Sequence, residues 1–131
     1  MLKKSPSGAL SPYYYKGGYF HGIHYGSYFD DREALFDMMK KEEYFLLSAP
    51  ERRRILMDFY ETNLTPDIVE EIVRHIGRLK SQIVKLAVAA DRKNLRLIGR
   101  AIKKSGLLAD GQVYYGTDME EGKTWLVSDS I

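Results

Sequence analysis

Two aromatic runs flank a pair of glycines near the start of the chain and predict a β-hairpin there. Aromatic runs at 13–15 and 19–25 flank Lys16-Gly17-Gly18. Glycine readily adopts the positive φ that a tight turn needs, so the runs are predicted to be antiparallel strands joined by this turn. Residues 1–8 are polar, with one proline and one glycine, and are predicted to be a flexible N-terminal segment.

Helices with one apolar stripe then alternate with short apolar strands. Helices are predicted from Asp30 or Asp31 to about Leu47, from Thr65 to Leu79, from Asp91 to Gly106, and after Thr117 or Asp118. The intervening runs at 55–60, 84–90 and 113–115 are predicted strands. This order indicates a single α/β domain over 9–131, with an N-terminal β-hairpin, a mostly parallel four- to five-stranded sheet and helices packed on it.

Amino-acid composition limits the possible location and partners of the protein. The 131 residues contain no cysteine, which excludes disulfides and thiolate metal sites and fits a reducing cytosol, so a cytoplasmic location is expected. The chain has no apolar run near the roughly 18 residues that a membrane span needs. A net charge of +2 gives little reason to expect nucleic acid as a partner.

Several short motifs occur in an order known from one family. They are the Lys16-Gly17-Gly18 turn, the stretches 26–30 and 31–36, Met57-Asp58-Phe59, and Gly116-Thr117-Asp118 followed by Trp125-Leu126. This order, over roughly Ala9 to Asp129, resembles the STAS domain of bacterial anti-sigma factor antagonists and of related uncharacterised bacterial proteins. The resemblance implies a STAS-like fold and a non-enzymatic regulatory or protein-interaction module.

One departure from the family pattern affects that implication. Antagonists of this family carry an Asp-Ser-Ser/Thr-Gly stretch whose serine is phosphorylated, whereas this chain has Asn63-Leu64-Thr65-Pro66-Asp67. Thr65 is the only hydroxyl there and is the candidate phosphosite, but its role as a helix N-cap explains it without phosphorylation. Some STAS-like proteins resemble lipid-binding domains, so the alternative is a small-molecule or lipid-binding protein with an apolar pocket between sheet and helices.

Polar residues follow three of the predicted strands, where helix N-termini present free N–H groups. This candidate binding edge consists of Asn63, Thr65, Asp67, Asp91, Arg92, Lys93 and Thr117. A small anionic molecule or an acidic loop of a partner protein could bind there. Ordinary capping is the competing interpretation, because Asp91 and Asp118 already place carboxylates at helix starts.

Catalytic and metal-binding patterns are absent from the sequence, so we expect neither an enzyme nor a cofactor. His21 and His24 lie three apart on a predicted strand and should point to opposite faces, and His75 is predicted on the polar side of its helix. These positions do not suggest a metal site. Adjacent glutamates such as Glu42 and Glu43 do not face each other on a helix.

Two surface features suggest contacts with other molecules. Arg92, Arg96 and Arg100 form a basic stripe with Lys103 and Lys104 nearby, which could meet acidic protein, phospholipid or nucleic acid, or simply be solvated. No aromatic residue interleaves with the stripe, which argues against single-stranded nucleic acid. Tyrosines concentrate between 13 and 28, so the hairpin could form a homodimer or pack over the sheet.

Overall fold

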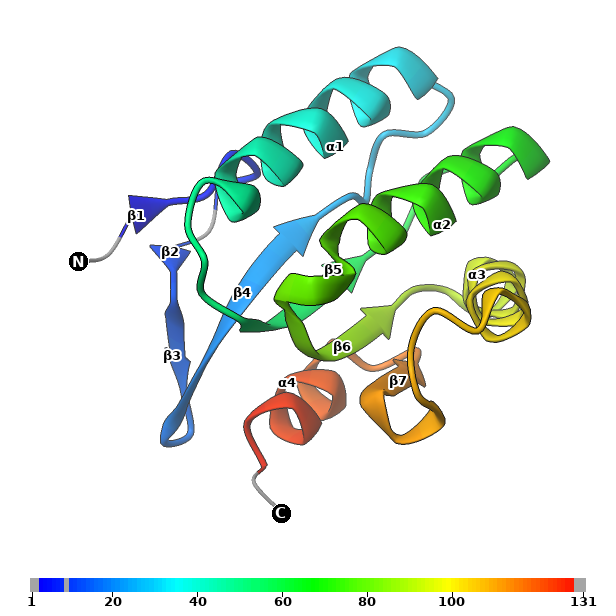
Figure 1. Cartoon of the computed structure of the whole chain (residues 1–131). Helices are drawn as coiled ribbons and strands as arrows, with labels where there is room; N and C mark the ends of the chain where they lie inside the picture. The colour runs from blue at the N-terminus through cyan, green and yellow to red at the C-terminus, as the bar shows by residue number, and fades with distance from the viewer. Residues whose placement is uncertain (1–2, 9, 129–131) are drawn as a thin grey trace.

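A five-stranded sheet runs through the centre of the computed structural model, which describes residues 3–8 and 10–128 (Figure 1). Its strands lie side by side in chain order: β3 (Tyr13–Tyr15), β4 (Gly18–His24), β5 (Arg53–Asp58), β6 (Ile83–Ala89) and β7 (Val113–Gly116). The β3–β4 pair is antiparallel, and the other three pairs are parallel. The predicted α/β class, with an N-terminal hairpin and a mostly parallel sheet, is confirmed.

Four α-helices cover the two faces of this sheet unequally. They are α1 (Arg32–Leu47), α2 (Pro66–Leu79), α3 (Arg92–Ser105) and α4 (Met119–Val127), with short 3₁₀ turns η1 (Lys80–Gln82) and η2 (Asp110–Gln112) before β6 and β7. Each strand–helix–strand unit moves one strand in the same direction, which puts α1, α2 and α3 on one face. The chain reaches α4 only after β7, and α4 lies on the opposite face (Figure 1).

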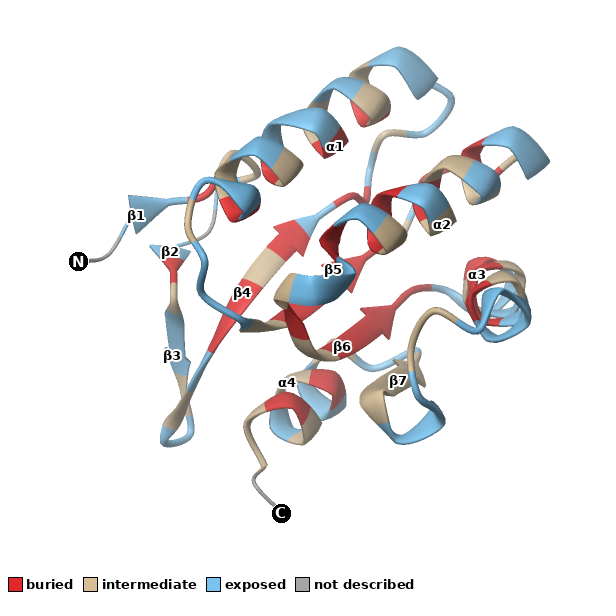
Figure 2. Cartoon of the chain, viewed as in Figure 1, coloured by how far each residue is buried: buried red, intermediate tan, exposed pale blue. Residues whose placement is uncertain are grey.

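Two apolar clusters separated by the sheet form the core. The larger lies under α1, α2 and α3 and includes Ile55, Met57, Ile72 and Ile98, all fully buried. The smaller lies under α4 around Leu56 and Leu126. Buried residues accordingly appear on the strands and on the inner sides of the helices (Figure 2). Asp31 and Asp91 cap α1 and α3 as predicted, and Gly106 ends α3 in the left-handed conformation at φ 67°.

The described part of the N-terminal segment, residues 3–8, contacts the rest of the domain. Strand β1 (Lys3–Lys4) pairs with β2 (Leu10–Ser11) as a separate antiparallel sheet. Ser5 and Ser11 are each only 3% exposed, and the Ser7 N–H and hydroxyl donate to Glu42 Oε2 at 3.0 and 2.7 Å. Hydroxyls in this segment thus satisfy a carboxylate that is fully buried on α1. This tertiary contact is not visible in the local composition.

The Glu42 carboxylate also lies within hydrogen-bonding distance of a histidine of the sheet. His21 Nε2 lies 2.9 Å from Glu42 Oε1, and His21 Nδ1 lies 2.7 Å from Ser11 Oγ. If His21 is neutral with its proton on Nε2, it donates to Glu42 and accepts the Ser11 hydroxyl proton. That arrangement satisfies every member of this buried chain, which links β2, β4 and α1.

Parts of the predicted ranges lie outside the described residues. Met1 and Leu2 of the predicted 1–8 segment, and Ala9 and Asp129–Ile131 of the predicted 9–131 domain, fall in this category. Within 3–8 and 10–128, every helix is too short or too polar to cross a bilayer.

Replacing Glu42 tests how much this buried network stabilises the fold. Glu42→Gln keeps the size, but its amide cannot accept from both His21 and Ser7, so at least one buried donor loses its partner. We expect the free energy of unfolding to fall by about 1–3 kcal/mol, measured by urea denaturation. Asp37→Asn is the control, because its exposed pair with Lys41 on the same helix should contribute less than about 0.5 kcal/mol. Equal losses in the two variants would contradict the prediction.

Candidate functional site

The loops after β4 and β5 continue the sheet beyond its regular strands. Ser27 N donates to Tyr60 O at 2.7 Å, Phe29 N to Glu61 O at 2.9 Å, and Asn63 N to Phe29 O at 2.8 Å. Ser27, Phe29 and Glu61 adopt positive φ values of 64°, 51° and 57°. Non-glycine residues in this region store strain, which concentrates at functional sites in proteins. The carboxyl edge of the sheet therefore has the strained backbone that is often found at functional sites.

Most side chains of the predicted edge serve local structure. Asn63 Nδ2 donates to Asp30, and Asp91 accepts from Asn94 N at 3.0 Å. Thr65 occupies the N-cap position of α2 without a side-chain capping bond, and its hydroxyl donates to Asp67 instead. Asp67 is also paired with Arg32, and the Thr65 hydrogen bond and the Arg32 charge lower the pKa of Asp67. The Thr117 carbonyl accepts from Tyr60 Oη at 2.7 Å.

The middle of this edge is acidic. Burial raises the pKa of the Tyr60 hydroxyl, and the carboxylates of Asp58, Asp118 and Asp91 raise it further. Three carboxylates thus act on one tyrosine at the carboxyl ends of neighbouring strands. A small anion would be repelled there, so the centre of the predicted edge suits an anionic ligand poorly.

His24 and Asp58 form a pair at this edge that the sequence interpretation missed. His24 Nδ1 lies 3.0 and 2.9 Å from the two Asp58 oxygens. Burial raises the pKa of Asp58, while the hydrogen bond and charge of His24 oppose that shift. A Cβ on Gly26 would approach Asp58 Oδ1 to 2.5 Å, so only glycine fits beside the carboxylate. The alternating pattern of Met57-Asp58-Phe59 was the available signal, because it puts Asp58 on the side of the sheet opposite its neighbours.

The histidines occupy three separate environments. His21 contacts Glu42 of α1, whereas His24 contacts Asp58 and lines a hollow with Met119 of α4, so the predicted opposite orientations are confirmed. The prediction that His75 lies on the polar side of its helix was wrong, because its side chain on α2 is fully buried. In the part of the chain that the structure describes, no group of three or more histidine or acidic side chains could hold a metal ion.

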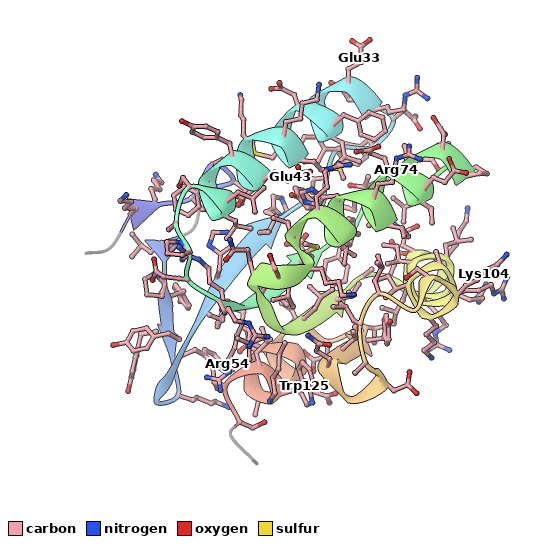
Figure 3. The ribbon with its side chains drawn as sticks, in the orientation of Figure 1. Glu33, Glu43, Arg54, Arg74, Lys104 and Trp125 are labelled. Carbon is pink, nitrogen blue, oxygen red and sulfur yellow. The ribbon has the colours of Figure 1, made fainter. Side chains whose placement is uncertain are left out.

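His75 belongs to a buried chain of hydrogen bonds between the sheet, α1 and α2. Tyr25 Oη and Glu43 Oε2 each lie 2.7 Å from one ring nitrogen of His75, and Figure 3 shows Glu43 on the side of α1 toward α2. Burial lowers the pKa of His75, so the neutral ring accepts from Tyr25 and donates to Glu43. Burial acts to raise the pKa of Glu43, but hydrogen bonds from Arg78 and His75 lower it below its usual value.

An apolar groove lies between α2 and α3, near the predicted edge. Its volume is about 510 Å³, and Thr65 lies at one end of it. The apolar part of the lining comes from both helices: Leu64, Pro66, Val69, Val73, Leu97 and Ala101. Glu70, Arg74 and Lys104 also line it. Arg74 is paired with Glu70, and Lys104 points outward from α3 in Figure 3. We call this hollow the α2–α3 groove.

Six exposed cations and no acidic residue occupy α3. They are Arg92, Lys93, Arg96, Arg100, Lys103 and Lys104, and we call them the α3 cations. None of them forms an ion pair with any residue in 3–8 or 10–128, and Lys103 alone contacts an aromatic ring, that of Tyr115. Charges on α1 and α2 behave differently, since Arg74 pairs with Glu70 and Glu71, and Arg78 with Glu43 and Glu71.

The positive charge at the start of α3 is unfavourable for the helix itself. Arg92 and Lys93 lie in its first turn, where the helix dipole disfavours cations. Of the predicted edge residues, Arg92, Lys93 and Thr117 are those whose side chains form no hydrogen bond or ion pair with another described residue. Together with the α2–α3 groove, the α3 cations form the candidate functional site.

One side of the tyrosine-rich hairpin packs over the sheet, as one of the two expectations had it, and the other side is exposed. Tyr13 and Tyr15 pack against Phe20 on the α4 face, at ring distances of 5.4 and 6.2 Å. Tyr14 and Tyr19 contact each other at 5.2 Å and are 60% and 53% exposed. The second pair leaves an aromatic surface at the edge of the sheet.

The environment of His75 predicts a loss of stability in mild acid. Its pKa is lowered in the folded protein, so the stabilising effect is complete above the unfolded value of 6.5 and is lost as pH falls below it. We expect the free energy of unfolding to decline from pH 7 toward pH 5, by at most about 1.4 kcal/mol per pH unit for this proton. His75→Gln should decline less steeply in urea titrations over the same range. Parallel curves for the two proteins would refute this assignment.

Comparison with known proteins gave no match. No protein-family model, no curated protein and no solved structure was found to be similar to this chain. The functional interpretation therefore rests on the geometry of the chain itself, chiefly on the α2–α3 groove and the α3 cations.

Proposed function

We propose that this chain is a non-enzymatic, cytoplasmic protein-interaction module that binds an acidic, amphipathic segment of a partner protein. The observation that carries the proposal is the set of unpaired α3 cations beside the apolar α2–α3 groove. Cations attract and orient an acidic partner, and burial of the groove's apolar lining would supply affinity. Helices bound in grooves use this combination of apolar anchors and charged flanks.

The spacing on α3 supports a shared binding face. Lys93, Leu97, Arg100 and Lys104 follow one another at intervals of four, three and four residues, so they lie along one side of the helix. Leu97 and Lys104 line the α2–α3 groove, which puts Lys93 and Arg100 on the groove side of α3 as well. A partner segment with apolar residues facing the groove and acidic residues beside them matches this face.

The STAS-like character of the module is also part of this proposal. A leading hairpin followed by alternating helices and strands is the feature that supports this part of the proposal. Thr65, the candidate phosphosite, lines the α2–α3 groove with its hydroxyl directed to Asp67. Phosphorylation there would add negative charge beside Asp67 and near the α3 cations, and so would compete with an acidic partner.

Binding of a small apolar molecule is the second candidate. The hollow between the sheet and α4 is lined by Phe20, Leu56 and Met119, with His24 and Asp58 also in its wall. Its volume of about 180 Å³ is below the range of about 300–1,000 Å³ typical of small-molecule pockets. The α2–α3 groove is larger and adjoins unpaired charge, so it favours a protein segment. A homodimer through Tyr14 and Tyr19 would leave that groove free.

Selection of binding peptides tests the proposal without knowledge of the natural partner. Displayed peptides would be selected on the wild-type protein and counter-selected on a Lys93→Glu/Arg100→Glu variant. We expect the recovered peptides to be acidic and amphipathic, and to bind the variant at least about tenfold more weakly, a difference of about 1.4 kcal/mol. Peptides without acidic residues, or peptides that bind both proteins equally, would contradict the proposal. So would tighter binding to anionic vesicles or oligonucleotides than to any peptide.

Two controls separate an effect of net charge and an effect on folding from a loss of the binding site. A Lys40→Glu/Lys80→Glu variant changes the net charge equally at two exposed lysines outside α3, and it should keep peptide binding. Glutamate at position 93 should favour the first turn of α3 by about 0.3–1 kcal/mol, so loss of binding in the Lys93→Glu/Arg100→Glu variant cannot be ascribed to unfolding of this helix. Thermal denaturation of both variants checks this point.

A further inference from the structure

Three consecutive arginines mark a second site, at the end of the sheet opposite the carboxyl edge. Arg52, Arg53 and Arg54 lie at the amino end of β5 and line a hollow of about 320 Å³ together with Tyr19, His21 and Glu51. In Figure 3, Arg54 lies on the opposite side of the molecule from Lys104 of α3. This hollow is separate from the α2–α3 groove and is lined by different elements.

Arg53 is held rigidly with part of its donor capacity unused. Its side chain is 15% exposed and lies over the Phe45 ring at 5.9 Å. One terminal nitrogen donates to Ser11 Oγ at 3.1 Å, and the other lies 3.4 Å from Glu51 Oε1. The Nε–H is buried and has no hydrogen-bond partner among the described residues. A buried guanidinium donor without an acceptor costs stability, so the position of Arg53 is not explained by its own hydrogen bonds alone.

The buried network behind the hollow fixes the direction of the Arg53 guanidinium. Ser11 Oγ lies 2.7 Å from His21 Nδ1, and His21 Nε2 lies 2.9 Å from Glu42 Oε1. Because a guanidinium group has donors and no acceptor, Ser11 Oγ accepts from Arg53, at 3.1 Å. His21 and Glu42 are almost completely buried, at 1% and 0% exposed, so this support does not rearrange freely. A preorganised donor of this kind binds an acceptor with little loss of entropy.

Positive charge in the hollow is incompletely balanced. Arg52 donates to the Ile83 carbonyl at 3.0 Å, which orients its guanidinium without neutralising it. Glu51 is the carboxylate in the lining, and it is 68% exposed with a long contact to Arg53. Among the described residues that line the hollow, the guanidinium groups of Arg52 and Arg53 therefore face one weakly engaged carboxylate, that of Glu51.

We propose that this hollow binds a phosphate group of a small phosphorylated ligand. Guanidinium groups match phosphate oxygens with paired hydrogen bonds, and a compact group with several acceptors can engage Arg52 and Arg53 together. Tyr19, which is 53% exposed in the wall of the hollow, can contact the rest of the ligand. This site is independent of the interaction proposed for α3.

Titration with inorganic pyrophosphate, followed by amide chemical shifts, tests the site directly. We expect saturable shifts at residues 19–21 and 51–54 and none on α3, with sodium chloride of equal ionic strength as the reference. Arg52→Gln and Arg53→Lys should each weaken binding about tenfold, because the first removes a charge and the second keeps the charge but loses the planar fork. Shifts confined to α3, or affinity unchanged in both variants, would overturn the proposal.

A matched variant and a second probe complete the test. Arg96→Gln removes one exposed cation from α3 and should leave pyrophosphate binding unchanged; equal weakening would show that the anion follows net charge alone. The second probe is cosedimentation with vesicles that contain a phosphoinositide, in the presence and absence of pyrophosphate. This experiment distinguishes a lipid headgroup from a free phosphorylated molecule as the source of the bound phosphate group. Thermal denaturation confirms that the Arg52→Gln protein, altered at an exposed position, stays folded.

Discussion

The buried carboxylate of Glu42 organises much of this structure. It sits without solvent contact on α1 and accepts hydrogen bonds from Ser7, with His21 Nε2 at 2.9 Å. A buried charge without these donors would be strongly destabilising, so the N-terminal segment and β4 must both stay in place around α1. The same network extends through Ser11 to Arg53 and thereby sets the geometry of the amino-end hollow.

Unequal cover of the two sheet faces separates the surfaces that the chain offers to other molecules. Helices α1, α2 and α3 share one face, and the exposed charges on α1 and α2 largely pair with each other. The α3 cations are the exception, and they adjoin the α2–α3 groove. The arginine hollow lies at the other end of the sheet. Two anionic ligands could therefore be bound without competing for the same side chains.

Local pattern was sufficient for the regular elements and for several caps. The helix starts at Asp31, Asp91 and Asp118 follow from the preference of short acidic side chains for N-caps, and all three accept a backbone N–H. The sequence also identified Arg92 and Lys93 as exposed residues of interest. It did not reveal the α2–α3 groove, because a groove depends on how two helices pack and not on either helix alone.

The sequence by itself determined the α/β class, the element order, the antiparallel hairpin and the opposite directions of His21 and His24, since these follow from residue spacing and turn chemistry. Only the tertiary structure decided that His75 is buried, that residues 3–8 are docked, and that His24 meets Asp58. Each of these features depends on a hydrogen-bond partner 34 or more residues away along the chain. These partners are Asp58 for His24, Glu42 for Ser7 and Tyr25 for His75. Local periodicity contains no information about such partners, because burial of a polar group becomes favourable only when packing brings its hydrogen-bond partner to it.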